Sequence, residues 1–249
     1  FVNMLPVVAC GKCDVIHQDL EDWTPEKYFD FYKTEYHQAY QENRGTMTYE
    51  ERYDHDCRVA DMRLDAYNLL DGSVGLDVGS SNSAFVHRAN KRNLRCLGLE
   101  PGEHIGDESV TVRGTLETAY FNPGYFDFVT MHDSIEHMID VNGSLKLVHQ
   151  ILRPNGLAII DLPDYFSPQG SHHWKHIEHL WFFTTEQFKV ILKNNGFEDQ
   201  EDSEHRLKYK DTRTRAFQNR DVILAFFLEL DHYLATQENL DPLHRQILC

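Results

Sequence analysis

The sequence has few basic residues for its size. Its 249 residues include 24 Lys and Arg against 40 Asp and Glu, which gives a formal net charge of -16 at pH 7. A chain this acidic repels polyanions unless a local basic patch intervenes. The dense basic run at residues 206–220 has the composition of a solvated hairpin. The charge therefore argues against nucleic acid as a partner and favours a small neutral or cationic substrate.

Long apolar runs and a paired set of cysteines are also missing. No run approaches the roughly 20 apolar residues that cross a bilayer, and the first residues show no basic leader followed by an apolar stretch. Five cysteines, an odd number scattered along the chain, suit reduced thiols better than a disulfide framework. We therefore expect a cytoplasmic protein without membrane contact. Because the first residue is Phe1, we also expect a fragment or a processed product.

The stretch at residues 74–86 has the pattern of a short buried strand, a turn of small residues and the start of a helix. Gly79 stands where the strand turns, and a residue without Cβ lets backbone approach a ligand closely there. A second strand, residues 94–99, ends in Glu100, about 20 residues on, where a ribose-binding carboxylate is expected. The pattern predicts a nucleotide site. Its expected contacts are Asp77, Gly79, Ser80, Ser81, Asn82, Glu100 and Pro101.

The missing glycines indicate which nucleotide binds. A dinucleotide fingerprint has glycine at positions 79, 81 and 84, whereas this chain has Ser81 and Ala84, so close approach of a pyrophosphate is poorly provided for. Asp77, just before the turn, suits a cationic ligand and repels a polyphosphate. Here the chain resembles the class I S-adenosylmethionine-dependent methyltransferases, whose first motif runs Asp-x-Gly-x-Gly-x-Gly. It departs from them in the later glycines, which are replaced by Ser81 and Ser83.

The order of the predicted elements indicates the fold. Strands and helices alternate from residue 71 onward, and 41% hydrophobic residues are enough for a packed core. We expect an α/β, Rossmann-like, seven-stranded and mostly parallel sheet with helices on both faces and an N-terminal helical extension. The last strand, residues 221–230, is an antiparallel edge in this scheme, although its apolar run equally fits a buried helix. The expected divisions are an extension and helical cap at 1–70, a methyltransferase domain at 71–230 and a tail at 231–249. The other expected strands are residues 110–113, 125–131, 157–163 and one opening at Phe197, and the helices are 83–93, 140–152 and 185–194.

The resemblance covers roughly residues 70–200. It is carried, in the family's order, by Phe-Asp-Phe-Val at 126–129, Ile-Glu-His at 135–137, Leu-Arg-Pro-Asn-Gly at 152–156, the run 179–184 and Asn-Gly-Phe at 195–197. It implies S-adenosylmethionine as cofactor and S-adenosylhomocysteine as product. It also implies that Gly114, Thr115 and Leu116 flank the adenine and that His132 lies at the cofactor site.

The N-terminal region carries two further features. Cys10 and Cys13 have the Cys-x-x-Cys spacing of half a zinc site; some methyltransferases carry a zinc ribbon with two such pairs. His17, His55 and Cys57 are the residues within the chain that would complete the site, but no spacing enforces this, and we expect no zinc in this chain alone. The charged, aromatic stretch from Thr24 to about residue 70 predicts two or more helices. Its candidates to touch a ligand are Tyr36, Tyr40, Arg52 and Arg58, although core packing is the better explanation for any single one of them.

Three side chains are placed at the acceptor side by the topology, because open α/β sheets bind ligands at the carboxyl ends of their strands. They are His132, Asp133 and His137, and a base among them, or His179, would take a proton from a hydroxyl acceptor. Asp133, Glu136 and His137 stand at i, i+3 and i+4, a spacing that predicts one helix face able to chelate a divalent cation, with His179 as a distant fourth ligand. Similar groups bind metal in ubiquinone-pathway O-methyltransferases and small-RNA 2′-O-methyltransferases.

These observations predict a methyltransferase that acts on a small molecule, with a hydroxyl as the candidate acceptor. Two alternatives stay open. One is a metal-dependent 2′-O-methyltransferase of RNA 3′ ends, which the acidic charge disfavours. The other is a catalytically silent module that binds the ligand. The sequence does not specify the acceptor, the metal dependence or the oligomeric state.

Overall fold

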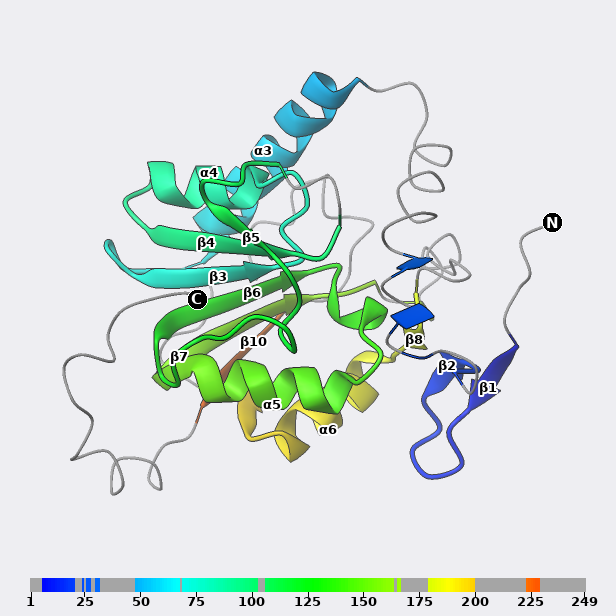
Figure 1. Ribbon diagram of the computed structural model, residues 1–249. Helices are drawn as coiled ribbons and strands as arrows, with labels where there is room; N and C mark the ends of the chain where they lie inside the picture. Colours follow the sequence, from blue (N-terminus) through cyan, green and yellow to red (C-terminus); the bar gives the residue numbers. More distant parts are fainter. Residues whose placement is uncertain are drawn as a thin grey trace.

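The computed structural model describes residues 6–20, 24, 26–27, 30–31, 48–67, 69–102, 106–163, 165–166, 179–199 and 223–228. Its main sheet has the order β5-β4-β3-β6-β7-β10-β9 (Figure 1). The strands are β3 (Val74–Val78), β4 (Arg95–Glu100), β5 (Thr111–Arg113), β6 (Phe126–His132), β7 (Leu152–Asp161), β9 (Phe197–Asp199) and β10 (Ile223–Leu228). Those from β5 to β7 are parallel, and β10 pairs antiparallel with both β7 and β9. The last strand is therefore antiparallel as predicted, but the edge of the sheet is β9, because β10 inserts between it and β7. The predicted Rossmann-like α/β fold with a parallel sheet is confirmed.

Helices cover both faces of this sheet (Figure 1). On one face, Leu64 of α3 (Tyr49–Ala66) and Phe85 of α4 (Ala84–Lys91) share a buried cluster with Phe128 of the sheet. On the other, Leu145 of α5 (Val141–Ile151) and Phe188 of α6 (Thr185–Asn194) belong to a second cluster. Burial of apolar surface in these two layers is the main force holding the fold together.

The strand order reverses between β3 and β6. The chain leaves β3 through α4 to reach β4 on one side, and it leaves β6 through α5 to reach β7 on the other. Right-handed connections of this kind place the two helices on opposite faces, so that a crevice opens at the carboxyl ends of the two central strands. The fold thereby positions a ligand site beside Gly79 and His132.

Capping side chains explain where three helices begin. Thr48 and Thr184 form capping boxes with Glu51 and Gln187, in which each side chain bonds the other residue's backbone N–H. The side chain of Asp140 accepts a hydrogen bond from the N–H of Gly143 at 2.9 Å. The helix predicted at residues 185–194 is confirmed as α6.

Two local predictions were wrong. β7 begins at Leu152 rather than at residue 157, because the chain turns extended directly after α5 and residues 152–156 join the strand, with an irregular register between Phe126 and Phe128. The segment after β6 is a single 3-10 turn, η1 (Ile135–His137), and Asp133 before it has φ 49°. Asp133, Glu136 and His137 therefore do not share a helix face.

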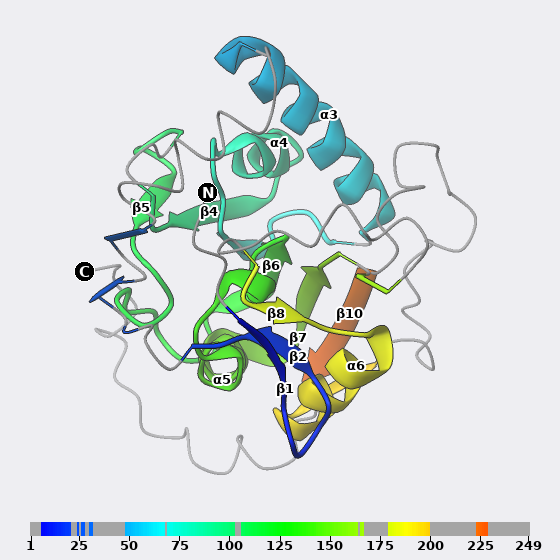
Figure 2. The same cartoon turned by 90° about the vertical axis from the view of Figure 1, so that its right-hand side faces the viewer.

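A small antiparallel sheet lies beyond the carboxyl ends of the main sheet. β1 (Val7–Ala9) and β2 (Ile16–Gln18) form a hairpin, and β2 also pairs with β8 (Trp181–Phe182). Figure 2 shows this sheet in front of β7. Through the pairing of β2 with β8, this sheet connects the N-terminal hairpin to the segment that precedes α6.

Several predicted features lie outside the described residues. They are Tyr36 and Tyr40, the basic run 206–220 and the tail 231–249. Of the helices expected before residue 70, the structure describes α3 and helical residues 26–27 and 30–31. None of the helices in the described ranges is both long and apolar enough to span a bilayer.

Candidate active site

The turn after β3 has the left-handed backbone that glycine adopts most readily. Gly79 has φ 80°, Ser81 48° and Ser83 63°, so serine holds two positions where a left-handed conformation costs about 1–2 kcal/mol. The fully buried Ser83 hydroxyl lies 2.7 Å from Thr111 Oγ1 and accepts a hydrogen bond from the N–H of Asp107 at 3.0 Å. These bonds offset strain and fix the turn against the start of β5.

The ends of β3 and β6 approach each other closely at Gly79. A Cβ at this position would lie 2.7 Å from Oγ of Ser134. The Ser134 hydroxyl is buried and donates to the carbonyl of Val78 at 2.7 Å. Glycine is therefore required both by its conformation and by space, and the close approach ties the nucleotide turn to η1.

Glu100 bridges two turns at the end of β4. Its Oε2 accepts from the N–H of Ser81 at 2.9 Å, and its Oε1 accepts from the N–H of Gly102 at 2.8 Å. Burial raises the pKa of Glu100 above its usual value, assisted by the charge of Asp77 and opposed by these two backbone donors. The carboxylate predicted to bind a ribose is therefore held at the crevice beside the turn.

Asp77 and His132 face each other across the two central strands. Asp77 is 3% exposed, accepts from Thr130 Oγ1 at 2.7 Å, and has its Oδ1 3.3 Å from His132 Nδ1. The other ring nitrogen of His132 lies 2.9 Å from the Tyr67 hydroxyl. Both nitrogens are thus engaged, which favours the cofactor-side prediction for His132 over its prediction as a base.

α3 contributes a buried arginine to the same crevice. Arg63 is 8% exposed, and its Nη2 lies 2.5 Å from Asp161 Oδ2 and 3.8 Å from Asp133 Oδ2. Burial alone would lower the pKa of Arg63, but the nearby charges of Asp161, Tyr67 and Asp133 outweigh it and raise the pKa. The guanidinium therefore stays charged and neutralises carboxylates at the ends of β6 and β7.

Three predicted acceptor-side residues converge beside η1. Glu136 is fully buried, and its ligand atom and those of His137 and His179 all lie within 4.8 Å of one another. The His137 and His179 rings meet edge to face with centroids 4.8 Å apart, and His179 Nδ1 lies 2.8 Å from the Tyr165 hydroxyl. Burial, with the charges of Glu136 and Asp133, raises the pKa of Tyr165 well above its usual value. Tyr165 therefore stays a phenol and orients the His179 ring.

Asp133 does not belong to this group. Its left-handed backbone precedes η1, and its carboxylate lies toward Arg63 rather than among the ligand atoms of Glu136, His137 and His179. The structure thus brings together three of the four predicted metal ligands. The acceptor-side role of Asp133 stays a prediction.

A family model described as a methyltransferase domain matches residues 49–202, more than half of the chain. The chain belongs to this family. The predicted resemblance to the S-adenosylmethionine-dependent methyltransferases is therefore confirmed, and the position of the cofactor at the ends of β3, β4 and β6 stays a prediction.

Individual relatives are distant. A ubiquinone biosynthesis O-methyltransferase of Bradyrhizobium diazoefficiens is 22% identical over 166 residues, which are 56% of this chain and 64% of the relative. A methyltransferase of Archaeoglobus fulgidus is 18% identical, with a TM-score of 0.54 over 66% of this chain and 75% of its own. One of Mesorhizobium loti is 14% identical, with a TM-score of 0.53 over 70% and 99%. The two structural likenesses show the fold alone.

The remaining predicted cofactor residues of the methyltransferase follow the carboxyl ends of β3, β4 and β5. The N–H of Gly114, after β5, donates to the Glu100 carbonyl at 3.0 Å, and Leu116 nearby is buried. Asn82 donates through Nδ2 to Asp56 of α3 at 2.8 Å. Their contacts with the cofactor, like those of Ser80, Pro101 and Thr115, stay predictions.

Sequence reasoning missed three side chains of the site, namely Arg63, Tyr67 and Tyr165. It chose Arg52 and Arg58 on α3 instead, but Arg58 is exposed and Arg52 Nε donates to Asp56 at 2.8 Å. The sequence did contain a pattern from which Arg63 and Tyr67 could have been found. Together with Ala60 and Leu64 they form one buried helix stripe, and an arginine within such a stripe indicates a buried partner.

Donor binding is expected to depend on Glu100 and on pH. Its carboxylate accepts charge-assisted hydrogen bonds, so Glu100→Ala should weaken S-adenosylhomocysteine binding by about 1.5–3 kcal/mol. Because burial raises the pKa of Glu100, affinity should fall as pH decreases through that raised value, where the carboxylate gains a proton. Calorimetry at several pH values measures both effects, and Glu100→Gln should bind weakly with a flatter pH profile. Unchanged affinity in Glu100→Ala, with an intact circular dichroism spectrum, would remove Glu100 from the donor site.

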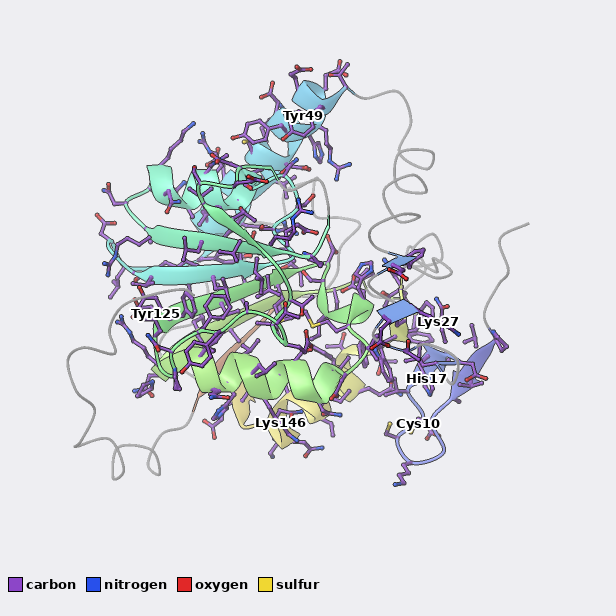
Figure 3. The ribbon with its side chains drawn as sticks, viewed as in Figure 1. Cys10, His17, Lys27, Tyr49, Tyr125 and Lys146 are labelled. Atoms are coloured by element: carbon purple, nitrogen blue, oxygen red, sulfur yellow. The ribbon has the colours of Figure 1, made fainter. Side chains whose placement is uncertain are left out.

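The two N-terminal cysteines lie in the loop of the β1–β2 hairpin. Figure 3 shows Cys10 at the loop end and His17 on the strand that returns from it. Hydrogen bonds from the backbone N–H groups of Lys12 and Cys13 lower the pKa of Cys10. His17 instead packs on Trp181, with ring centroids 5.1 Å apart, and among the described residues the cysteines join no group of three metal-ligating side chains. His55 and Cys57 belong to α3.

Zinc is not expected to stay bound to this chain alone. Two thiolates leave half of a tetrahedral shell empty. Elemental analysis of the purified protein should therefore give far less than one zinc per chain. Stoichiometric zinc that disappears in Cys13→Ser would contradict this prediction.

Proposed function

We propose that the protein transfers the methyl group of S-adenosylmethionine to a hydroxyl oxygen of a small molecule. The observation that carries the proposal is the convergence of Glu136, His137 and His179 at the carboxyl end of β6, directly after Ser134, which ties this segment to the cofactor turn. Methyl transfer from a sulfonium is an in-line displacement, so the enzyme mainly aligns donor and acceptor and excludes water.

The cofactor side suits a cationic ligand with a ribose. Glu100 offers a carboxylate to the ribose hydroxyls, and the adjacent strand β3 carries the buried carboxylate of Asp77 beside His132. S-adenosylmethionine supplies the electrophilic methyl group when bound. The acidic residues then favour the cationic donor over its neutral-sulfur product by charge.

The acceptor side suits removal of a proton. The imidazole of His179 is oriented by Tyr165, and that of His137 meets it edge to face. Histidine is a common general base in enzymes, and either imidazole would take the hydroxyl proton as the new C–O bond forms and the C–S bond of the donor breaks. The overall acidity of the chain supports a small acceptor over RNA.

The same three residues fit a divalent cation. One carboxylate and two imidazoles are a donor set typical of transition-metal ions, and ligand atoms within 4.8 Å need only a small contraction to share one ion. The Tyr165 hydroxyl on His179 Nδ1 is the outer partner that ligating histidines usually have. A bound cation would lower the pKa of the acceptor hydroxyl.

A labelled-donor screen tests the proposal. Wild-type protein is incubated with methyl-labelled S-adenosylmethionine and, separately, phenols, catechols, aliphatic alcohols, amines and a short RNA with a free 3′ end. Label on a hydroxylated small molecule supports the proposal. Label on RNA alone or on amines alone would contradict it, and donor binding without transfer to any acceptor would favour the catalytically silent alternative.

A further inference from the structure

The N-terminal hairpin is attached to the acceptor side of the methyltransferase through Gln18. This residue ends β2, and its side chain is fully buried. Its Nε2 donates to the backbone carbonyl of His179 at 2.6 Å, and its backbone N–H donates to the carbonyl of Leu180 at 2.8 Å. One residue of the hairpin thus holds two successive carbonyls of the segment that carries His179.

The same segment is held from its other side by η1. The N–H of Leu180 donates to the backbone carbonyl of Glu136 at 2.9 Å. The backbone of His179 and Leu180 therefore lies between β2 and η1, and it brings His179 to Glu136 and His137. The two attachments together hold the backbone from which the His179 ring projects. This matters because side chains at a reacting site tolerate little displacement.

We propose that Gln18 is a positioning residue, which holds His179 in register with Glu136 and His137 through the hydrogen bond from its amide to the His179 carbonyl. The inference rests on the proposed acceptor-side role of His179. It gives the hairpin a part in the reaction that is separate from any metal at Cys10 and Cys13. Gln18 Oε1 is buried and accepts no hydrogen bond from the described residues, so the bond of the side chain to this segment is the one its Nε2 donates.

Gln18→Glu keeps the size of the side chain and removes the donor while the new carboxyl is ionised. A carboxylate would then face the His179 carbonyl and repel it. Loss of a residue that orients a ligating histidine typically reduces activity about 10–100-fold, and we take this range as the scale of the effect. We expect that loss in kcat, on the acceptor found in the labelled-donor screen, with unchanged affinity for S-adenosylhomocysteine. Since burial raises the pKa of a glutamic acid, the activity relative to wild type should recover as pH is lowered and the carboxyl regains an O–H donor.

Gln18→Met tests the same bond with a neutral side chain of similar volume. It should show the loss in kcat without recovery at low pH. The control is Val8→Thr, an exposed substitution in the same hairpin, which should match wild type. The imidazole NMR signals of His179, assigned by their absence in His179→Ala, should move in Gln18→Met and stay in place in Val8→Thr.

The outcomes separate the two proposals. Full kcat in Gln18→Met, or unmoved His179 signals, would overturn the role of Gln18. Full turnover in His179→Ala would instead overturn the proposed acceptor site itself.

Discussion

Replacing His179 or His137 with alanine is expected to lower kcat by about 10²–10⁴, the contribution of a positioned general base. Donor affinity should stay nearly constant, because Asp77 and Glu100 are retained. Steady-state kinetics and calorimetry measure the two quantities. The matched control is His55→Ala on α3, where the histidine is exposed and pairs with Asp56 at 3.2 Å; its kcat should equal that of wild type.

Chelation separates a base from a metal ligand in the same assay. If the pair acts as base, a chelator leaves turnover unchanged. If the three residues hold a cation, a chelator abolishes turnover, Mg²⁺ or Mn²⁺ restores it, and Glu136→Ala behaves like the two histidine variants. Full activity in all three alanine variants would place the acceptor site elsewhere and leave these residues with a structural role.

Arg63→Met is expected to lower the free energy of unfolding by about 3–5 kcal/mol, since it leaves the buried charge of Asp161 without its partner. Urea unfolding followed by circular dichroism measures the change. Arg58→Met, an exposed position on the same helix, should change stability by no more than about 0.5 kcal/mol.

The double variant Arg63→Met with Asp161→Asn tests the stated cause. Removing both charges should recover much of the lost stability, because replacing a whole buried pair is often nearly neutral. A loss in Arg63→Met similar to that in Arg58→Met would contradict the buried ion pair. A double variant no more stable than Arg63→Met would assign the loss to packing of the arginine stem instead.

Features encoded by neighbouring residues could be predicted from the sequence. The capping threonine and the terminating glycine set the bounds of α6, and the turn after Gly79 meets Glu100 at the end of the neighbouring strand, as the sequence pattern predicts. The proximity of His137 and His179 also followed from topology, since the first comes after β6 in the chain and the second after β7, and these neighbouring parallel strands end at the same edge of the sheet.

Features set by contacts distant in sequence could not be predicted. Arg63 meets Asp161, and Gln18 meets His179, across long stretches of chain, and no local pattern links either pair. The helix-face argument for Asp133 failed because a left-handed residue and a 3-10 turn replace the regular helix that i, i+3 and i+4 spacing requires.

A crystal structure with bound S-adenosylhomocysteine tests the central claim most directly, since anomalous scattering locates the sulfur. The account predicts a ribose on Glu100 and a sulfur that faces Glu136, His137 and His179 across the crevice between β3 and β6. A product molecule bound there with its sulfur directed away from these three residues, or bound outside the crevice, would contradict it.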